Sequence, residues 1–384
     1  MFLKKTMERN GALIEAAAEF HRKGLLLPDT YLVDMDTLLK NAAVMKAAAD
    51  RSGVHLYFML KQLGRNPEIA RRLVRLGFDG AVAVDFREAL SLIRAGIPLG
   101  NVGHLVQIPK GALTCILSAR PQYVTVYSIE KAREIDEVCR NLGFVQKLML
   151  RVIGKDDVLY PGQYGGFQLE ELEDAARKLA GLGHVRIAGL TSFPCFLFNE
   201  QTERIEPTPN AVTLQAAKKI LSDMDVEIEE VNMPSATCCA SIPQIRRLGG
   251  THGEPGHGLS GTTPLHAVAD CAEIPCIVYL SEISHNYGGR AYCYGGGHYR
   301  RSHVRQALVG PPKEGRLLDV IPPADESIDY HFGLAGTAEV SQSVIMAFRT
   351  QIFVTRSSVA LIDGLASGRP AVRGIFSPLG QRLK

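Results

Sequence analysis

The sequence lacks the features that mark several large classes of protein. It contains no tryptophan, and its 43 basic and 40 acidic residues leave a formal net charge of only +3. The basic residues are scattered and form no runs, so we expect no nucleic-acid partner. The opening segment, MFLKKTMERN, is polar and predicts neither a secretory leader nor a membrane anchor. These absences together predict a cytoplasmic protein without a membrane partner.

The eight cysteines do not follow the common cysteine frameworks. No CxxC pair occurs, and the adjacent Cys238 and Cys239 have no histidine or cysteine partner at the spacing of a structural zinc site. We therefore predict reduced thiols and no bound metal.

The residues that are present have the composition of a soluble globular protein. Hydrophobic residues make up 46% and charged residues 22% of the 384 positions. A chain of this length can hold two domains, for example an α/β barrel of about 250 residues and a smaller second domain.

Short apolar runs alternate with amphipathic stretches from about residue 30 to residue 265. The alternation predicts successive βα units, and eight units in a row favour a closed barrel over an open sheet. Amphipathic runs such as EIARRLVRLG and AVTLQAAKKILSD predict helices between the strands. The predicted strands are 54–60, 80–85, 101–108, 123–128, 147–153, 187–193, 227–233 and 251–256.

The pattern changes after residue 265, where helical periodicity fades. Segments such as PCIVYLSEIS and VIMAFRTQIFVTRSSVALID are rich in β-branched and aromatic residues, which predicts a β-domain. Near the start of the chain, ALIEAAAEFHRKG predicts a helix that ends at Gly24. The predicted organisation is an N-terminal helical segment over 1–28, a (β/α)8 barrel over 29–265 and a C-terminal β-domain over 266–384.

Lys61 comes directly after the first predicted barrel strand. Barrel active sites lie at that end of the strands. A lysine held among apolar residues loses hydration of its charged form, so its free amine becomes available to form an imine. A strand-end lysine that reaches solvent is the simpler interpretation of this residue taken alone.

The segments after the seventh and eighth predicted strands, PSATCCAS and EPGHGLSGTT, have the composition of phosphate-binding loops. In many barrels these two loops form a phosphate site. Ser235 and Thr237 are small hydroxyl residues, and Gly256 and Gly258 permit close approach of the backbone. Two ordinary turns are the alternative. A lysine that follows the first strand and faces such loops is the arrangement expected of a pyridoxal-phosphate site.

These segments resemble the alanine-racemase-like barrels, a family that includes the basic amino-acid decarboxylases. The resemblance covers about residues 30–265. FMLKQLGRNP is similar to the family's lysine segment, which implies that Lys61 carries pyridoxal 5'-phosphate as a Schiff base. GFDGAVAVDFREAL resembles the segment that places an acidic residue, here Asp85, near the cofactor. LMLRVIG is similar to the segment that brings an arginine, here Arg151, into the barrel.

EPGH, at 254–257, is similar to the EPGR segment of the decarboxylases. The resemblance implies that Glu254 contacts the pyridine nitrogen and that Gly256 binds phosphate. A carboxylate at this nitrogen keeps it protonated, which makes the ring an electron sink. His257 stands in place of the family's arginine, so its phosphate contact is expected to be weaker or dependent on pH. The remaining expected cofactor contacts are Ser235, Thr237 and Tyr330.

The β-domain is expected to supply the group that acts on the other face of the cofactor. RAYCYGGGHYRR gathers Tyr292 and Cys293 beside a triple glycine that permits a sharp reversal of the chain. A β-hairpin with tyrosines on a half-buried face is the alternative. In racemases of this fold an acid/base residue comes from the partner subunit's β-domain, so the resemblance also implies a homodimer.

Three functions are open at this point. The first is an amino-acid racemase, in which Lys61 removes the α-proton and Tyr292 or Cys293 returns one on the opposite face. The second is a decarboxylase, which Glu254 favours, although the decarboxylases' catalytic cysteine segment has no counterpart near GLAGTAEVSQS. The third is a cofactor-binding protein without turnover, against which the large β-domain argues. We predict racemisation of an amino acid whose identity the sequence does not define.

Overall fold

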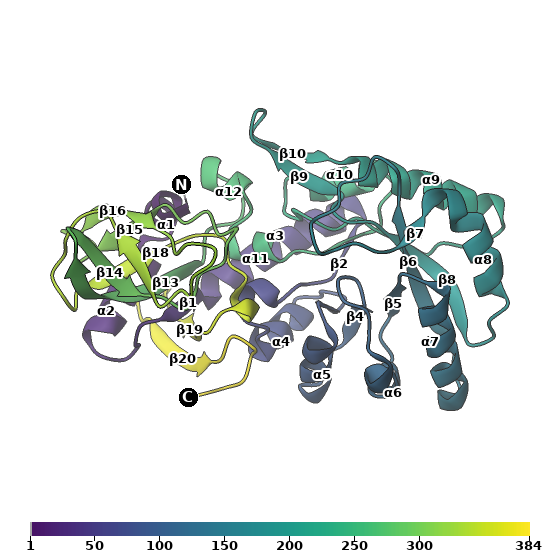
Figure 1. Cartoon of the computed structure of the whole chain (residues 1–384), viewed down its shortest axis with the longest axis horizontal. Coiled ribbons are helices and arrows are strands. Elements are labelled where there is room, and N and C mark those ends of the chain that lie inside the picture. Colours follow the sequence, from purple (N-terminus) through teal and green to yellow (C-terminus); the bar gives the residue numbers. More distant parts are fainter. Residues whose placement is uncertain (1) are drawn as a thin grey trace. The chain divides into compact units, whose positions relative to one another are not determined.

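The computed structural model describes residues 2–384 and contains two compact units of the chain (Figure 1). The barrel unit comprises Met45–Leu60 and Pro67–Gly256. The β-unit comprises residues 2–44, Lys61–Asn66 and His257–Lys384. No helix among residues 2–384 is both long and apolar enough to cross a lipid bilayer.

The barrel unit is built on eight parallel strands. Phe58 joins the first strand to the second, because its amide donates to the Gly80 carbonyl at 3.0 Å and its carbonyl accepts from the Val82 amide at 2.9 Å. The ring of strands is therefore closed. Their order around it is β2 (His55–Leu56), β12 (His252–Gly253), β11 (Glu230–Asn232), β8 (Val185–Thr191), β6 (Gln146–Ile153), β5 (Tyr123–Val126), β4 (Leu99–Val102) and β3 (Ala81–Ala83). The predicted barrel is confirmed, since each of the eight predicted strands overlaps one of these.

Helices follow most of the barrel strands and flank them in Figure 1. The sequence sets their ends: at the start of α7, the Ser128 hydroxyl accepts from the Lys131 amide, and Gly143 ends the helix with a φ of 71°. Two short strands, β9 (Phe196–Asn199) and β10 (Arg204–Pro207), form a hairpin. The helices are α4 (Pro67–Arg75), α5 (Phe86–Arg94), α6 (Leu113–Ser118), α7 (Ile129–Leu142), α8 (Leu172–Ala180), α9 (Pro209–Asp223) and α10 (Ile242–Arg247).

The β-unit is built on a nine-stranded, mainly antiparallel sheet. Helices α1 (Phe2–Arg9) and α2 (Gly11–Arg22) bury apolar residues in the same hydrophobic cluster as the sheet. The strand order is β14 (Arg290–Tyr294), β17 (His331–Leu334), β16 (Arg316–Ile321), β15 (Gln306–Val309), β18 (Ser343–Met346), β13 (Ile277–Tyr287), β1 (Thr30–Asp34), β19 (Ser358–Asp363) and β20 (Ala371–Phe376), and β13 also pairs with β14.

The boundaries of the two units differ from the boundaries of the predicted domains. Strand β1, which falls in the predicted barrel range, pairs with β13 and β19 in the β-unit. All five residues of its sequence, TYLVD, are buried. A strand that is apolar on both faces needs neighbours on both edges and cover on both sides, and the middle of this sheet provides them.

Candidate functional site

Lys61 directly follows a buried strand segment of the barrel. Residues 56–60 are all buried, and Lys61 opens the short 3-10 helix η1 (Lys61–Leu63). The Tyr57 amide donates to the Gly253 carbonyl at 3.1 Å, and the Met59 amide donates to the Pro255 carbonyl at 3.0 Å. The chain that leads to Lys61 therefore runs beside the chain that carries Glu254.

Glu254 is buried at the carboxyl end of β12, with 5% of its surface exposed. Its Oε1 accepts from Asn232 Nδ2 at 2.5 Å, and its backbone amide donates to Thr237 Oγ1 at 3.2 Å. His104 Nε2 lies 3.8 Å from its Oε2. These neighbours hold the carboxyl group in one orientation inside the barrel unit.

A second carboxyl group, Glu230, is buried on the same strand as Asn232. Its Oε2 accepts from the Tyr57 hydroxyl at 2.7 Å. Burial raises the pKa of Glu230 well above its usual range, against the effect of the Tyr57 hydrogen bond, and the charge of Glu254 acts in the same direction as burial. The surroundings of Glu230 therefore favour its neutral form.

Arg151 on β6 is 1% exposed, and its guanidinium group is held by the barrel unit. It donates to the Tyr127 hydroxyl at 2.9 Å and to the Gln163 carbonyl at 2.7 Å. Its Nε is buried without a hydrogen-bond partner among residues 2–384, as is Asn232 Oδ1. Buried polar atoms of this kind are expected to have partners, so each of them has room in its hydrogen bonding for a water molecule or a polar ligand group.

The loop after β11 has an uncommon backbone conformation. Ser235 and Ala236 have φ values of 89° and 48°, which side chains with a Cβ atom adopt at a cost. Ser241 Oγ accepts from the Cys238 amide at 3.0 Å and donates to the Ala236 carbonyl at 2.9 Å, which fixes this shape. Strained loops are frequent at ligand sites, so the loop is suited to the predicted phosphate contacts of Ser235 and Thr237.

Gly256 is buried at the end of the barrel unit, and His257 begins α11 (His257–Ser260) in the β-unit. Thr262 Oγ1 lies 3.0 Å from His257 Nδ1. Burial lowers the pKa of His257 well below its usual range, and the charges of Arg349 and Lys61 add to the effect. The imidazole of His257 is therefore neutral through the physiological pH range. Of the two expectations for its phosphate contact, this favours a weaker contact over a contact that depends on pH.

Asp85 and Tyr330 have partners close in the fold. Asp85 caps α5, where its side chain accepts from the Glu88 amide at 2.9 Å. Tyr330 is 64% exposed in the β-unit, with the Arg356 guanidinium carbon 5.9 Å from its ring centroid. Their contacts with a cofactor stay predictions.

Tyr292 and Cys293 point to opposite faces of β14. The Tyr292 ring stacks on His285 with centroids 4.9 Å apart and 7° between the planes. Cys293 is 0% exposed, and burial raises the pKa of its thiol to about 12. Tyr292 is half-buried. Tyr292 therefore has the more accessible of the two predicted acid/base side chains, and both roles stay predictions.

The burial of Cys293 has a measurable consequence. We expect a thiol reagent at pH 8 to label the exposed Cys115 quickly and Cys293 only after unfolding. The thiolate reacts, and a pKa of about 12 leaves a thiolate fraction roughly a thousandfold below that of an ordinary thiol. Peptide mapping by mass spectrometry over time measures both rates. Native-state labelling of Cys293 as fast as Cys115 would show that the thiol is accessible.

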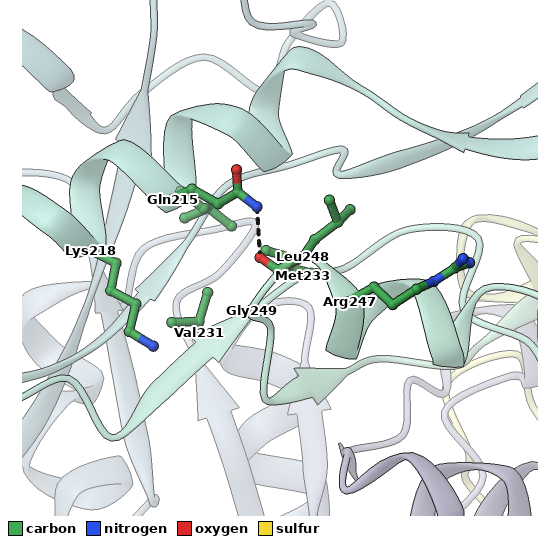
Figure 2. Close-up of a pocket in the computed structure, with 8 residues that line it drawn as sticks. Gln215, Lys218, Val231, Met233, Arg247, Leu248 and Gly249 are labelled. Carbon is green, nitrogen blue, oxygen red and sulfur yellow. Dashed lines mark hydrogen bonds between the residues drawn. The ribbon is translucent and has the colours of Figure 1, made fainter.

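The pocket in Figure 2 is a separate feature of the barrel unit. Its volume is about 320 Å³, and Gln215 Nε2 donates to the Leu248 carbonyl within it at 3.0 Å. Val231, which lines it, alternates along β11 with Glu230 and Asn232, so the pocket lies on the other face of this strand from these two residues. It is lined by Leu214, Gln215, Lys218, Val231, Met233, Arg247, Leu248 and Gly249.

Two family descriptions match the chain. Residues 33–264 match the family described as alanine racemase, N-terminal domain, and residues 278–372 match the YhfX-like C-terminal domain. The chain belongs to the alanine racemase N-terminal domain family. It is 42% identical over 385 residues to the uncharacterized protein YhfX of Escherichia coli strain K12, with both chains covered completely. The resemblance inferred from the lysine and EPGH segments is thus confirmed.

Solved structures share the fold. D-threonine aldolase from Filomicrobium marinum has a TM-score of 0.65 at 17% identity, with 92% of this chain and 95% of that chain covered. Alanine racemase from Clostridium difficile 630 has a TM-score of 0.64 at 18% identity, covering 92% and 99%. D-threo-3-hydroxyaspartate dehydratase from Delftia sp. HT23 has a TM-score of 0.67 at 16% identity, covering 90% and 97%. These structures carry three different activities on one fold, so the likeness establishes the architecture and leaves the reaction open.

Proposed function

We propose that the protein is a pyridoxal-phosphate-dependent enzyme that racemises an amino acid. One observation carries the proposal: Lys61 directly follows the strand segment whose backbone is hydrogen-bonded to the segment that holds the buried Glu254. An amine and an oriented carboxyl group at the carboxyl ends of neighbouring barrel strands are the two groups that this cofactor needs at its aldehyde and its ring nitrogen.

The residues of the barrel unit fit the cofactor. Asn232 orients Glu254, and both Arg151 Nε and Asn232 Oδ1 are buried without hydrogen-bond partners among residues 2–384. Glu254 would face the ring nitrogen, Arg151 would contact the ring substituents, and the strained loop with Ser235 would bind the phosphate. When bound, pyridoxal phosphate supplies an electron sink for negative charge at the substrate's α-carbon.

In the proposed reaction, the side chains of the chain hold and move protons. Lys61 Nζ takes the proton from one face of the α-carbon, and a second group must deliver a proton to the opposite face. We assign that second role to Tyr292, whose ring is more accessible than the Cys293 thiol. In the proposed homodimer, the β-unit of the partner subunit provides this group.

Decarboxylation is the second candidate, and the carboxyl group of Glu254 favours it. The EPGH segment resembles the decarboxylases' EPGR segment, and the carboxyl group of its Glu254 is oriented by Asn232. The electron sink that the cofactor would supply serves the loss of a carboxylate as well as the loss of a proton. Decarboxylation requires one proton donor, so Tyr292 would not be needed.

A panel of single D- and L-amino acids incubated in deuterated water tests the proposal. We expect α-proton exchange, followed by NMR, together with loss of optical rotation from either enantiomer and no release of carbon dioxide. Carbon dioxide release without racemisation would establish the decarboxylase instead. If the cofactor is bound and no amino acid on the panel exchanges its α-proton, the chain is a binding protein without turnover.

A further inference from the structure

Residues 349–353 are fixed against the residues that follow the first barrel strand, within the β-unit. Thr350 Oγ1 donates to the Gln62 carbonyl at 2.8 Å, and both residues are buried. The Arg65 guanidinium carbon lies 4.7 Å from the centroid of the Phe353 ring. The position of this segment relative to Lys61, which adjoins Gln62, is therefore set by contacts on both sides of it.

The residues on either side of Thr350 interact with His257. Gln351 Nε2 lies 3.5 Å from His257 Nε2. Arg349 acts on the same imidazole as its strongest charged neighbour, ahead of Lys61. Arg349 and Gln351 thus flank Thr350, which is bonded to Gln62, and both of them interact with His257.

The strongest charge effects on His257 come from basic groups. In descending order they are those of Arg349, Lys61, His266 and Arg301, and burial holds His257 itself neutral. A guanidinium group and a primary amide present several N–H donors, and a guanidinium group binds carboxylate or phosphate through two parallel hydrogen bonds. Gln351 and His257 add neutral hydrogen bonds without further charge.

We propose that Arg349, together with Gln351 and His257, binds an oxyanion, either the phosphate of the cofactor or an acidic group of the substrate's side chain. This inference rests on the proposed function, because both anions are ligands of a pyridoxal-phosphate enzyme. The two sources share their chemistry: in each case Arg349 provides the positive charge, and Gln351 and His257 provide neutral hydrogen bonds.

The test compares the wild type with Arg349→Gln and Arg349→Lys, and uses the exposed Arg305→Gln as a matched control in the same unit. Binding of inorganic phosphate to the cofactor-free protein is measured by calorimetry. Binding of pyridoxal phosphate and of pyridoxal is measured by absorbance titration. We expect Arg349→Gln to weaken phosphate binding about 10- to 100-fold, the scale of one charge-assisted pair, Arg349→Lys to recover part of it, and Arg305→Gln to bind as the wild type.

The pattern of losses identifies the source. If pyridoxal phosphate binds more weakly to Arg349→Gln while pyridoxal does not, Arg349 holds the cofactor's phosphate. If both cofactors bind as in the wild type but aspartate no longer perturbs the holoenzyme's spectrum while asparagine still does, Arg349 holds the substrate's acidic group. Equal weakening of pyridoxal and pyridoxal phosphate, or unchanged phosphate binding, overturns the proposal.

Failure of the proposed function gives a different result. If the wild type binds neither pyridoxal nor pyridoxal phosphate, the cofactor assignment fails. The calorimetric comparison then decides the anion site by itself: loss of phosphate binding in Arg349→Gln supports the site, and unchanged or absent binding overturns it. Circular dichroism and thermal unfolding of each variant show that the fold is intact.

Discussion

Lys61→Ala is expected to abolish the covalent attachment of pyridoxal phosphate and all turnover. The attachment requires a primary amine at bonding distance from the cofactor's aldehyde, and alanine has none. Lys61 is only partly buried, so its loss should change the free energy of unfolding by less than about 1 kcal/mol. Borohydride reduction followed by peptide mapping measures the attachment, and α-proton exchange measures turnover.

Lys110→Ala is the matched control for this experiment. Lys110 is exposed at the start of the short helix η2 (Lys110–Ala112), and its removal should leave both the attachment and the exchange rate unchanged. A reducible adduct on Lys61→Ala at the wild-type stoichiometry would place the cofactor lysine elsewhere. The role of the first barrel strand would then need to be reassigned as well.

The barrel could be predicted because most of its strands carry a local signal. Parallel strands buried on both faces form apolar runs, and KLMLRVI at 147–153 corresponds closely to β6. The segment THGEPG has no such run and contains a proline, and it forms only the two-residue β12. The weakest local signal among the eight predicted strands thus corresponds to one of the two shortest barrel strands.

Strand β1 shows the limit of prediction from apolar runs. TYLVD is an apolar run like those of the barrel strands, yet it pairs with β13 and β19 in the β-unit. An apolar run predicts that a strand is buried, but the choice of neighbours depends on residues far away in the sequence. The eight predicted strands begin at residue 54, so neither this strand nor its place in the sheet of the β-unit was predicted.

The residues of the candidate site also differ in whether the sequence could predict them. Lys61 and Glu254 could be singled out because their positions after strands, and their similarity to family segments, carry information. Asn232, which orients Glu254, is a single polar residue in a short strand and belongs to no motif. The contact between Gln351 and His257 joins residues far apart in the chain, and no local pattern predicts such a pair.

Glu254→Gln is expected to keep the bound cofactor and to slow α-proton exchange by roughly 100- to 10,000-fold, the scale of a lost electrostatic or proton-transfer contribution. The amide has the shape of the carboxylate, and its oxygen can still accept from Asn232 Nδ2. It carries no negative charge, so it cannot hold a proton on the ring nitrogen. The exchange rate at saturating amino acid and the affinity for pyridoxal phosphate, measured on the same preparations, separate a chemical effect from a binding effect.

Glu230→Gln provides the matched control, because Glu230 is another buried glutamate of the barrel unit and its surroundings favour the neutral form. Replacing a neutral acid with an amide removes no charge, and Gln retains an oxygen that accepts from the Tyr57 hydroxyl. We expect the exchange rate to stay within roughly threefold of the wild type, an activation difference below about 1 kcal/mol. If Glu230→Gln slows exchange as much as Glu254→Gln does, the effect comes from the packing of the barrel interior, and the assignment of Glu254 to the ring nitrogen is wrong.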